Sequence, residues 1–365
     1  MFTSAQGQKF LVMQETARRA FIATLVTVGV VVLALALWKV RVVVFLLFLA
    51  FTVAAAMRPG VEALAARRVP RAFGVLAHYV VLAVLVGCFL WLVVPRALDQ
   101  VDRAIENVPT TQKELGDAAQ HSGGVKHDVL VGIQKRLQDL PRASELVRPA
   151  VAVTVTAFEV IVAIFFVFAA AAYWIFERDR AIDYVCQLLP RPKRKRVRDT
   201  WHLIDLKLGS YVRGQALLIV IVAAILSFAF WAIHLPYWLL LGSFAGLVEI
   251  VPVIGPLVAG ALAVGVGLTQ SIGVAVAAGI VVLVQRQLED YLLAPRILGG
   301  AVGLSPLLVM VGVFASGILF GPLAIILAIP AVAVVTTLVD VIVRDRDPAE
   351  EDVPTVLFPA KEAER

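Results

Sequence analysis

EIVPVIGPLVAG, residues 249–260, interrupts a part of the chain that is otherwise apolar enough to cross a membrane. The stretch contains two prolines, two glycines and one carboxylate. Proline cannot donate a backbone hydrogen bond and clashes with the preceding helical turn, whereas glycine permits tight reversals. In hydrocarbon an unsatisfied backbone group is costly, so a broken helix survives only where protein or a water-filled cavity pairs the freed groups. Such breaks are typical of the substrate and ion sites of transporters.

The composition indicates a membrane protein. Of the 365 residues 60% are hydrophobic and 16% are charged, whereas a soluble domain has about 25% charged residues. A spanning helix needs roughly 20 apolar residues, so the charge-free runs 250–285 and 297–339 should each fold back on themselves. We therefore expect an all-α polytopic integral membrane protein. It should have about eight transmembrane helices, with broken or re-entrant helical hairpins in the C-terminal half.

The charge distribution predicts the orientation. Basic residues exceed acidic ones by two, three and five in residues 1–19, 58–71 and 177–213. By the positive-inside tendency these segments and both termini should be cytoplasmic. The basic run RPKRKRVR at 191–198 indicates an orientation signal that contacts anionic membrane lipids, and no nucleic-acid partner is expected.

These features divide the chain into six segments. Apolar residues at helical spacing on both sides of His-Ser-Gly-Gly at 121–124 predict an amphipathic helical hairpin, and a polar, acidic, proline-containing end predicts disorder. The segments are a cytoplasmic N-terminus (1–19), transmembrane helices 1–3 (20–94), an extracytoplasmic amphipathic helical segment (95–148), transmembrane helix 4 with a basic cytoplasmic segment (149–213), a transport core with broken helices (214–343) and a disordered cytoplasmic tail (344–365).

Glu249 is the first candidate for a functional role. A carboxylate near the bilayer midplane is costly unless it faces a cavity, has a partner or takes up a proton, so this residue could bind substrate or couple transport to protons. Alternatively, it lies at the membrane surface and caps a half-helix. Residues 236–249 span only about 21 Å of a ~30 Å core, so a half-helix or re-entrant hairpin fits this stretch better than a spanning helix. Glu159, within another apolar run, poses the same choice. The neighbouring candidates, which could instead form only a structural kink, are Pro252, Gly255, Pro256 and Gly260.

QRQLEDYLLAPRILGG, residues 285–300, is the second candidate. On a helix, Arg286 stands three and four positions before two acidic residues and could pair with both on one face. The proline should then end or bend the helix. Either this is a salt-bridged cytoplasmic turn, or it is a gate whose charges change partners during transport. The candidate pathway residues are Gln285, Glu289, Asp290, Pro295, Arg296 and Gly299, followed by Ser305 and Pro306.

Enzymatic classes lack the motifs that they require. The sequence contains no phosphate-binding GxxxxGK[ST] loop, so ATP would not drive transport directly. It contains no HExxH motif, and Cys88 and Cys186 form no metal or redox signature. Ser305 lacks the partner pattern of a nucleophile. We expect no catalytic residue, cofactor or metal, which leaves a secondary transporter or a membrane scaffold without transport.

Four segments of the second half follow a known pattern. They are YVRGQ at 211–215 with Arg213 and Gln215, GLVEIVPVIGPLVAG at 246–260, VQRQLEDYLLAPRILGGAVGLSPLLV at 284–309, and GILFGPLAIILAIPAVAV at 317–334 with Gly321 and Pro330. Over about residues 150–343 the chain resembles the autoinducer-2 exporter-like family of bacterial and archaeal transporters. Asp290 stands where that family often has Asn, and Ser305 where it often has His.

The resemblance implies a function and a location. It implies a permease for secondary export of a small polar solute, by analogy the quorum-sensing molecule autoinducer-2, and it implies homo-oligomeric assembly. Some members of the family look like monovalent cation/proton antiporters, so a cation or proton stays open as the partner. A multi-pass protein of a prokaryotic inner membrane is expected.

Overall fold

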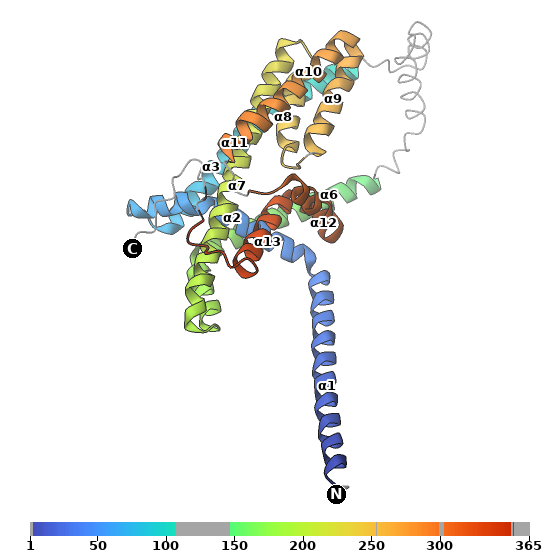
Figure 1. The fold of residues 1–365 in the computed structure, drawn as a ribbon. Helices are drawn as coiled ribbons and strands as arrows, with labels where there is room; N and C mark the ends of the chain where they lie inside the picture. Colours follow the sequence, from blue (N-terminus) through green and yellow to red (C-terminus); the bar gives the residue numbers. More distant parts are fainter. Residues whose placement is uncertain (1–2, 107–146, 253, 299–302, 352, 354–365) are drawn as a thin grey trace. The chain divides into compact units, whose positions relative to one another are not determined.

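The computed structural model describes residues 3–106, 147–252, 254–298, 303–351 and 353 (Figure 1). These residues form helices and connecting turns without any β-strand, which confirms the predicted all-α class. The chain divides into two units, Met1–Phe48 and Leu49–Arg365. Gly299 and most of the predicted amphipathic hairpin, residues 107–146, lie outside the described residues.

The first unit contains helix α1 (Thr3–Lys39) and the beginning of α2 (Arg41–Ala66). Large apolar side chains between Phe21 and Leu35 are exposed all around α1. A helix that is apolar on every side is typical of a membrane environment or a protein core.

The second unit holds most of the helices that could span a bilayer. Within the described residues, six helical stretches are long and apolar enough, so the predicted membrane character is confirmed and the chain is a multi-pass membrane protein. The expected number of about eight is not confirmed. The six stretches are Arg41–Ala66, Arg71–Trp91 of α3 (Arg71–Glu106), Glu159–Gln187 of α6 (Val147–Gln187), α7 (Arg191–Ala232), Ile272–Ile297 and Pro322–Ile342.

Three further apolar helices of the second unit are shorter than the roughly 20 residues that a spanning helix needs. They have 11, 17 and 15 residues, which correspond to about 16, 25 and 22 Å against a core of ~30 Å. These helices are α8 (Trp238–Val248), α9 (Ile254–Gln270) and α12 (Pro306–Phe320).

Helices α8 and α9 form a hairpin whose tip is the chain break that the sequence predicts. α8 ends at Val248 and α9 begins at Ile254, with turns between them (Figure 1). At the tip, the Gly255 amide donates to the carbonyl of Val251 at 3.0 Å. The structure thus shows the broken helices that the sequence predicts at this point.

Small residues bring α7 and α8 close together. A Cβ atom on Gly246 would lie 2.6 Å from the carbonyl oxygen of Ile219, and one on Gly242 would collide with Ser227. Small residues at such contacts are an ordinary packing device in membranes. The core beside them comprises Val222, Leu226, Phe230, Leu235, Leu241, Ala245, Ala259, Ala263 and Ala278.

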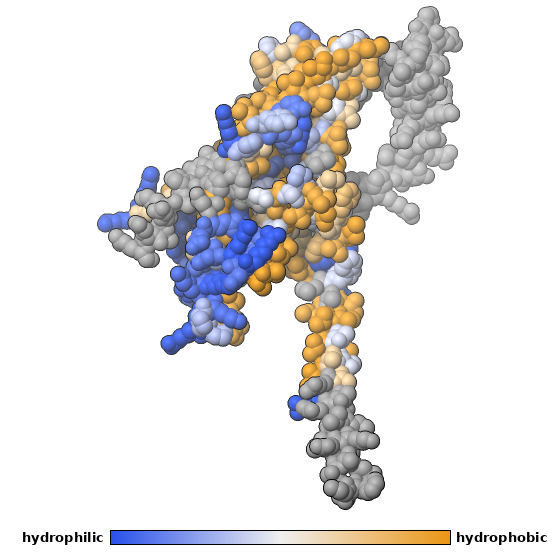
Figure 2. Space-filling view, viewed as in Figure 1, coloured by the Kyte–Doolittle hydropathy of each residue, from blue (hydrophilic) through white to orange (hydrophobic). Residues whose placement is uncertain are grey.

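The outer surface of the second unit is largely apolar. Figure 2 shows hydrophobic residues over α8 and α9, and hydrophilic ones over the polar end of α7. Trp91 and Ile318 are 78% and 76% exposed, which is expected where lipid surrounds the protein.

The final apolar run also folds back, as predicted. After α12 the chain reverses at Gly321, whose φ of +100° favours glycine. A 3₁₀ helix η3 (Pro322–Leu327) then leads into α13 (Ala328–Ile342). Beyond α13, residues 344–351 and 353 belong to the segment expected to be a tail, and several of them contact α7.

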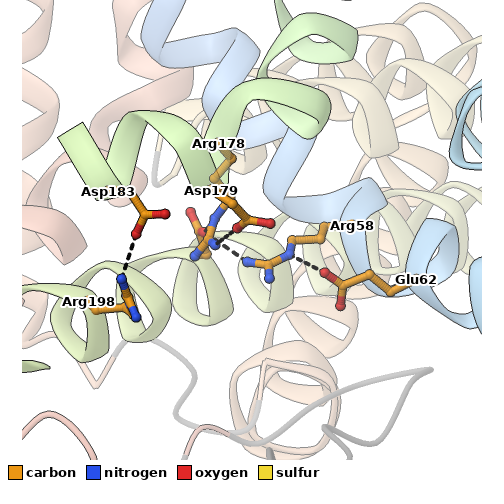
Figure 3. A network of polar contacts seen from close by, with 7 residues as sticks. Arg58, Glu62, Arg178, Asp179, Asp183 and Arg198 are labelled. Atoms are coloured by element: carbon orange, nitrogen blue, oxygen red, sulfur yellow. Dashed lines mark hydrogen bonds and ion pairs between the residues drawn. The ribbon is translucent and has the colours of Figure 1, made fainter. Parts of the chain in front are cut away.

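Charged residues join α2, α6 and α7 at their polar ends (Figure 3). Asp205 of α7 accepts from Arg178 Nε at 2.5 Å and from Arg58 Nη1 at 3.3 Å. Arg58 also pairs with Glu62 at 2.5 Å. Because Asp205 and Arg178 are buried, this carboxylate neutralises charges that water cannot solvate well.

We expect Asp205→Asn to lower the free energy of unfolding by about 2 kcal/mol, because a buried guanidinium loses its counter-charge. Asp183→Asn is the matched control, since its pair with Arg198 is exposed and should contribute less than about 1 kcal/mol. Denaturant unfolding in detergent measures both. Equal losses would show that Asp205 has no special structural role.

Candidate functional site

The tip of the α8–α9 hairpin meets α10 (Ile272–Leu288) at a buried polar cluster. Glu249, Gln285 and Glu289 are 7%, 4% and 5% exposed. Arg286 Nη1 lies 3.4 Å from Glu249 Oε1 and 3.3 Å from Glu289 Oε1. One guanidinium nitrogen is therefore shared by two buried carboxylates from different helices.

The other contacts of the cluster follow the helical spacing of α10 and of the turn that continues it. Arg286 Nη2 lies 3.0 Å from Asp290 Oδ1, and Gln285 Nε2 donates to Glu289 Oε2 at 2.9 Å. Residues three and four positions apart share a helix face, so the predicted pairing of Arg286 with Glu289 and Asp290 is confirmed. Asp290 is exposed, which places it at the edge of the cluster.

Pro295 does not end the helix, contrary to one of its two predicted effects. The helix continues past this proline, through a π-helical turn η2 (Glu289–Leu293) into α11 (Ala294–Ile297). π-helical turns accommodate an extra residue and often lie at functional sites. Glu289 begins this turn, so the irregularity starts at the cluster itself.

Helix α7 completes the site from the other side. Gln215 Nε2 donates to the backbone carbonyl of Glu249 at 3.1 Å, which satisfies a carbonyl that the end of α8 leaves unpaired. Tyr211, one turn earlier on α7, is buried. The two residues lie on the same helix face.

A small pocket adjoins Glu249 and has room for about one water molecule. In this conformation the pocket accommodates a proton or a small ion more readily than a larger solute. Its lining is mainly apolar and consists of Leu226, Phe230, Ala245, Glu249, Pro256, Ala259, Val282 and Gln285.

The cluster has an excess of negative charge. Three carboxylates face one guanidinium, and two of the carboxylates are buried. Buried like charges are costly without a compensating cation or proton. The arrangement can therefore hold one proton.

Other predicted residues form no hydrogen bond or ion pair with this cluster in the described part of the chain. Ser305 accepts from the Leu308 amide at 3.4 Å as the N-cap of α12, with Pro306 in the first turn. Arg213 donates to the Ala56 carbonyl at 3.1 Å. The remaining ones are Pro252 at the hairpin tip, Gly260 within α9, exposed Glu159 and Arg296, Gly321 at its turn and buried Pro330.

Sequence reasoning missed the charged network of Arg58, Arg178 and Asp205 and the π-helical turn. Arg58 and Asp205 are 147 residues apart, so no local spacing connects them. The turn follows no residue pattern that the sequence displays.

We expect Arg286→Gln to lower the free energy of unfolding by about 1–2 kcal/mol near neutral pH, because two buried carboxylates lose their shared cation. The loss should shrink at low pH, where the carboxyl groups are protonated and repel each other less. Thermal unfolding in detergent at several pH values measures it. Arg296→Gln, at an exposed position, is the matched control and should change stability by less than about 0.5 kcal/mol. A loss that is independent of pH would contradict this account.

Comparison with known proteins agrees with this architecture. Residues 25–344 match the family described as "AI-2E family transporter". The "Putative transport protein YrrI" of Bacillus subtilis is 27% identical over 303 residues, covering 81% of this chain and 86% of that protein. The "Putative transport protein MT0215" of Mycobacterium tuberculosis is 29% identical over 347 residues, covering 90% and 91%. The family match covers most of the chain and all of the described cluster, and it supports a role in membrane transport. The chain belongs to the AI-2E family of transporters.

Proposed function

We propose that this chain is a secondary transporter that exports a small polar solute and uses Glu249 and Glu289 to carry the coupling proton. The observation that carries the proposal is the pair of buried carboxylates where the tip of the α8–α9 hairpin meets the end of α10, with one shared guanidinium. Broken helices of this kind hold substrates and coupling ions in transporters.

The balance of charge supports proton uptake. Arg286 can compensate only one of the two buried carboxylates, and a second uncompensated charge in apolar surroundings is costly. Two carboxyl groups that share a site hold a proton more strongly than isolated ones do. Release and uptake of this proton would change the ion pairs of Arg286, and thereby couple the cluster to the position of the hairpin.

The solute and the surroundings are proposed from family resemblance. An autoinducer-2-like polar molecule is the proposed cargo, and homo-oligomeric assembly in a prokaryotic inner membrane is the proposed setting. The basic segment 177–213 favours cytoplasmic termini, because Lys and Arg accumulate on that side.

A monovalent cation/proton antiporter is the second candidate. The specific observation in its favour is the third carboxylate, Asp290. This residue is exposed, and its Oδ1 atom lies 3.0 Å from Arg286 Nη2. An acidic entrance next to a buried acidic pair would attract a cation.

Flux in liposomes tests both candidates. Purified protein is reconstituted, a pH gradient is imposed, and movement of labelled autoinducer-2 and of protons is followed. Solute movement that a protonophore abolishes supports the first candidate. Proton release on addition of Na⁺ or K⁺ without solute movement supports the second. If neither is observed, the proposed function is wrong.

A further inference from the structure

The chain segment after α13 lies along the polar half of α7. Asp345 Oδ1 is 2.6 Å from Arg196 Nη1, and Glu351 Oε1 is 2.6 Å from Lys207 Nζ. Val353 is buried against Leu203. These three contacts, at positions 196, 203 and 207 of one helix, hold residues 345–351 and 353 against about 16 Å of α7.

Lys207 is the most buried member of this contact. It is 7% exposed, and its ammonium group also donates to Thr337 Oγ1 of α13 at 3.2 Å. A buried ammonium group needs a counter-charge, and Glu351 supplies it in the described part of the chain. Lys207 therefore joins α7, α13 and the segment that follows α13.

Arg196 closes the other end of the contact. Its guanidinium also donates to the backbone carbonyls of Val341 and Arg346, the latter at 3.5 Å. The side chain thus fastens the end of α13 as well as Asp345 to α7. Two basic residues of α7, eleven positions apart, engage two acidic residues of one short segment.

We propose that residues 344–351 and 353 form an electrostatic latch that pins α7 to α13 and slows transport until it is released. The inference rests on the proposed transport function. Helix α7 is continuous from Lys207 to Gln215, which donates to the Glu249 carbonyl at 3.1 Å. A restraint on α7 is therefore transmitted over two helical turns to the hairpin tip. Alternating access requires packed elements to move against each other, and a latch across α7 and α13 opposes that movement.

The ionic nature of the latch makes it sensitive to salt. Glu351 and Asp345 are partly or fully accessible, so dissolved ions weaken both pairs. Flux by the intact chain should therefore rise with ionic strength. The change should amount to about two- to fivefold, in line with partly exposed ion pairs.

Charge reversal with rescue tests the latch in the full-length chain. Glu351→Lys is compared with the double variant Lys207→Glu/Glu351→Lys, and with Glu350→Lys as a control at the exposed neighbouring position. Hydrogen exchange of the amides of residues 344–351 reports release of the segment. Flux in liposomes at about 0.01 M and about 1 M salt, where the Debye length is about 30 Å and about 3 Å, reports its effect on transport.

We expect Glu351→Lys to accelerate exchange, to raise low-salt flux about two- to fivefold and to remove the salt dependence. The double variant should restore the wild-type values, and Glu350→Lys should leave them unchanged. Unchanged exchange in Glu351→Lys, or released segments with unchanged flux, would overturn the latch. A wild-type chain without any flux would instead overturn the proposed function, and exchange would still show whether the contact itself exists.

Discussion

Glu249→Gln is expected to reduce gradient-driven flux by about 100-fold or more while the protein remains folded and membrane-inserted. The amide is nearly isosteric with the carboxyl group but cannot take up or release a proton. It also removes one negative charge from Arg286, which retains Glu289 at 3.3 Å and Asp290 at 3.0 Å. Flux into liposomes, with protein insertion measured in parallel, tests this prediction.

Glu177→Gln provides the matched control, because it is the same substitution at an exposed residue of α6 that pairs only with Arg180 in the described structure. Its flux should equal that of the unmodified chain. If Glu249→Gln also retained full flux, Glu249 would have no part in transport. Loss of flux together with loss of folding would instead indicate a structural role.

Gly255→Ala is expected to destabilise the protein by about 3 kcal/mol, at the upper end of the range for overpacking. A Cβ atom there would collide with the carbonyl oxygen of Val248 and would lie 2.6 Å from its carbonyl carbon. Backbone atoms of an adjoining helix cannot rotate away as a flexible side chain can. The hairpin tip must therefore shift, and Glu249 with it, so flux should fall as well. Unfolding in detergent and flux in liposomes are the measurements.

Gly265→Ala tests the same substitution in the same helix. A Cβ atom at this position would have nothing within 4 Å, so the change should be neutral or stabilising by up to about 1 kcal/mol through helix propensity. If both alanine variants behaved alike, the close approach at the hairpin tip would not determine stability.

Local features of the sequence predicted much of the fold and of the site. The break after Val248 follows from prolines and glycines, and the pairing of Arg286 with Glu289 and Asp290 follows from helical spacing. The number of crossings was harder to predict, because hydrophobicity alone does not distinguish a spanning helix from a re-entrant one. The continuation of the helix past Pro295 was missed, since the widened π-helical turn before it depends on packing.

The sequence by itself determined that the chain enters a bilayer, where its helices break and which charges lie at the break, because these depend on composition and on short-range geometry. The tertiary structure alone decided which distant groups meet. Gln215 reaches the Glu249 carbonyl, Arg286 reaches across from α10, and Lys207 reaches Glu351. Such contacts join residues 34 and 37 positions apart or more, and no periodicity in a single helix specifies them. They depend on how close the small residues of neighbouring helices allow those helices to pack.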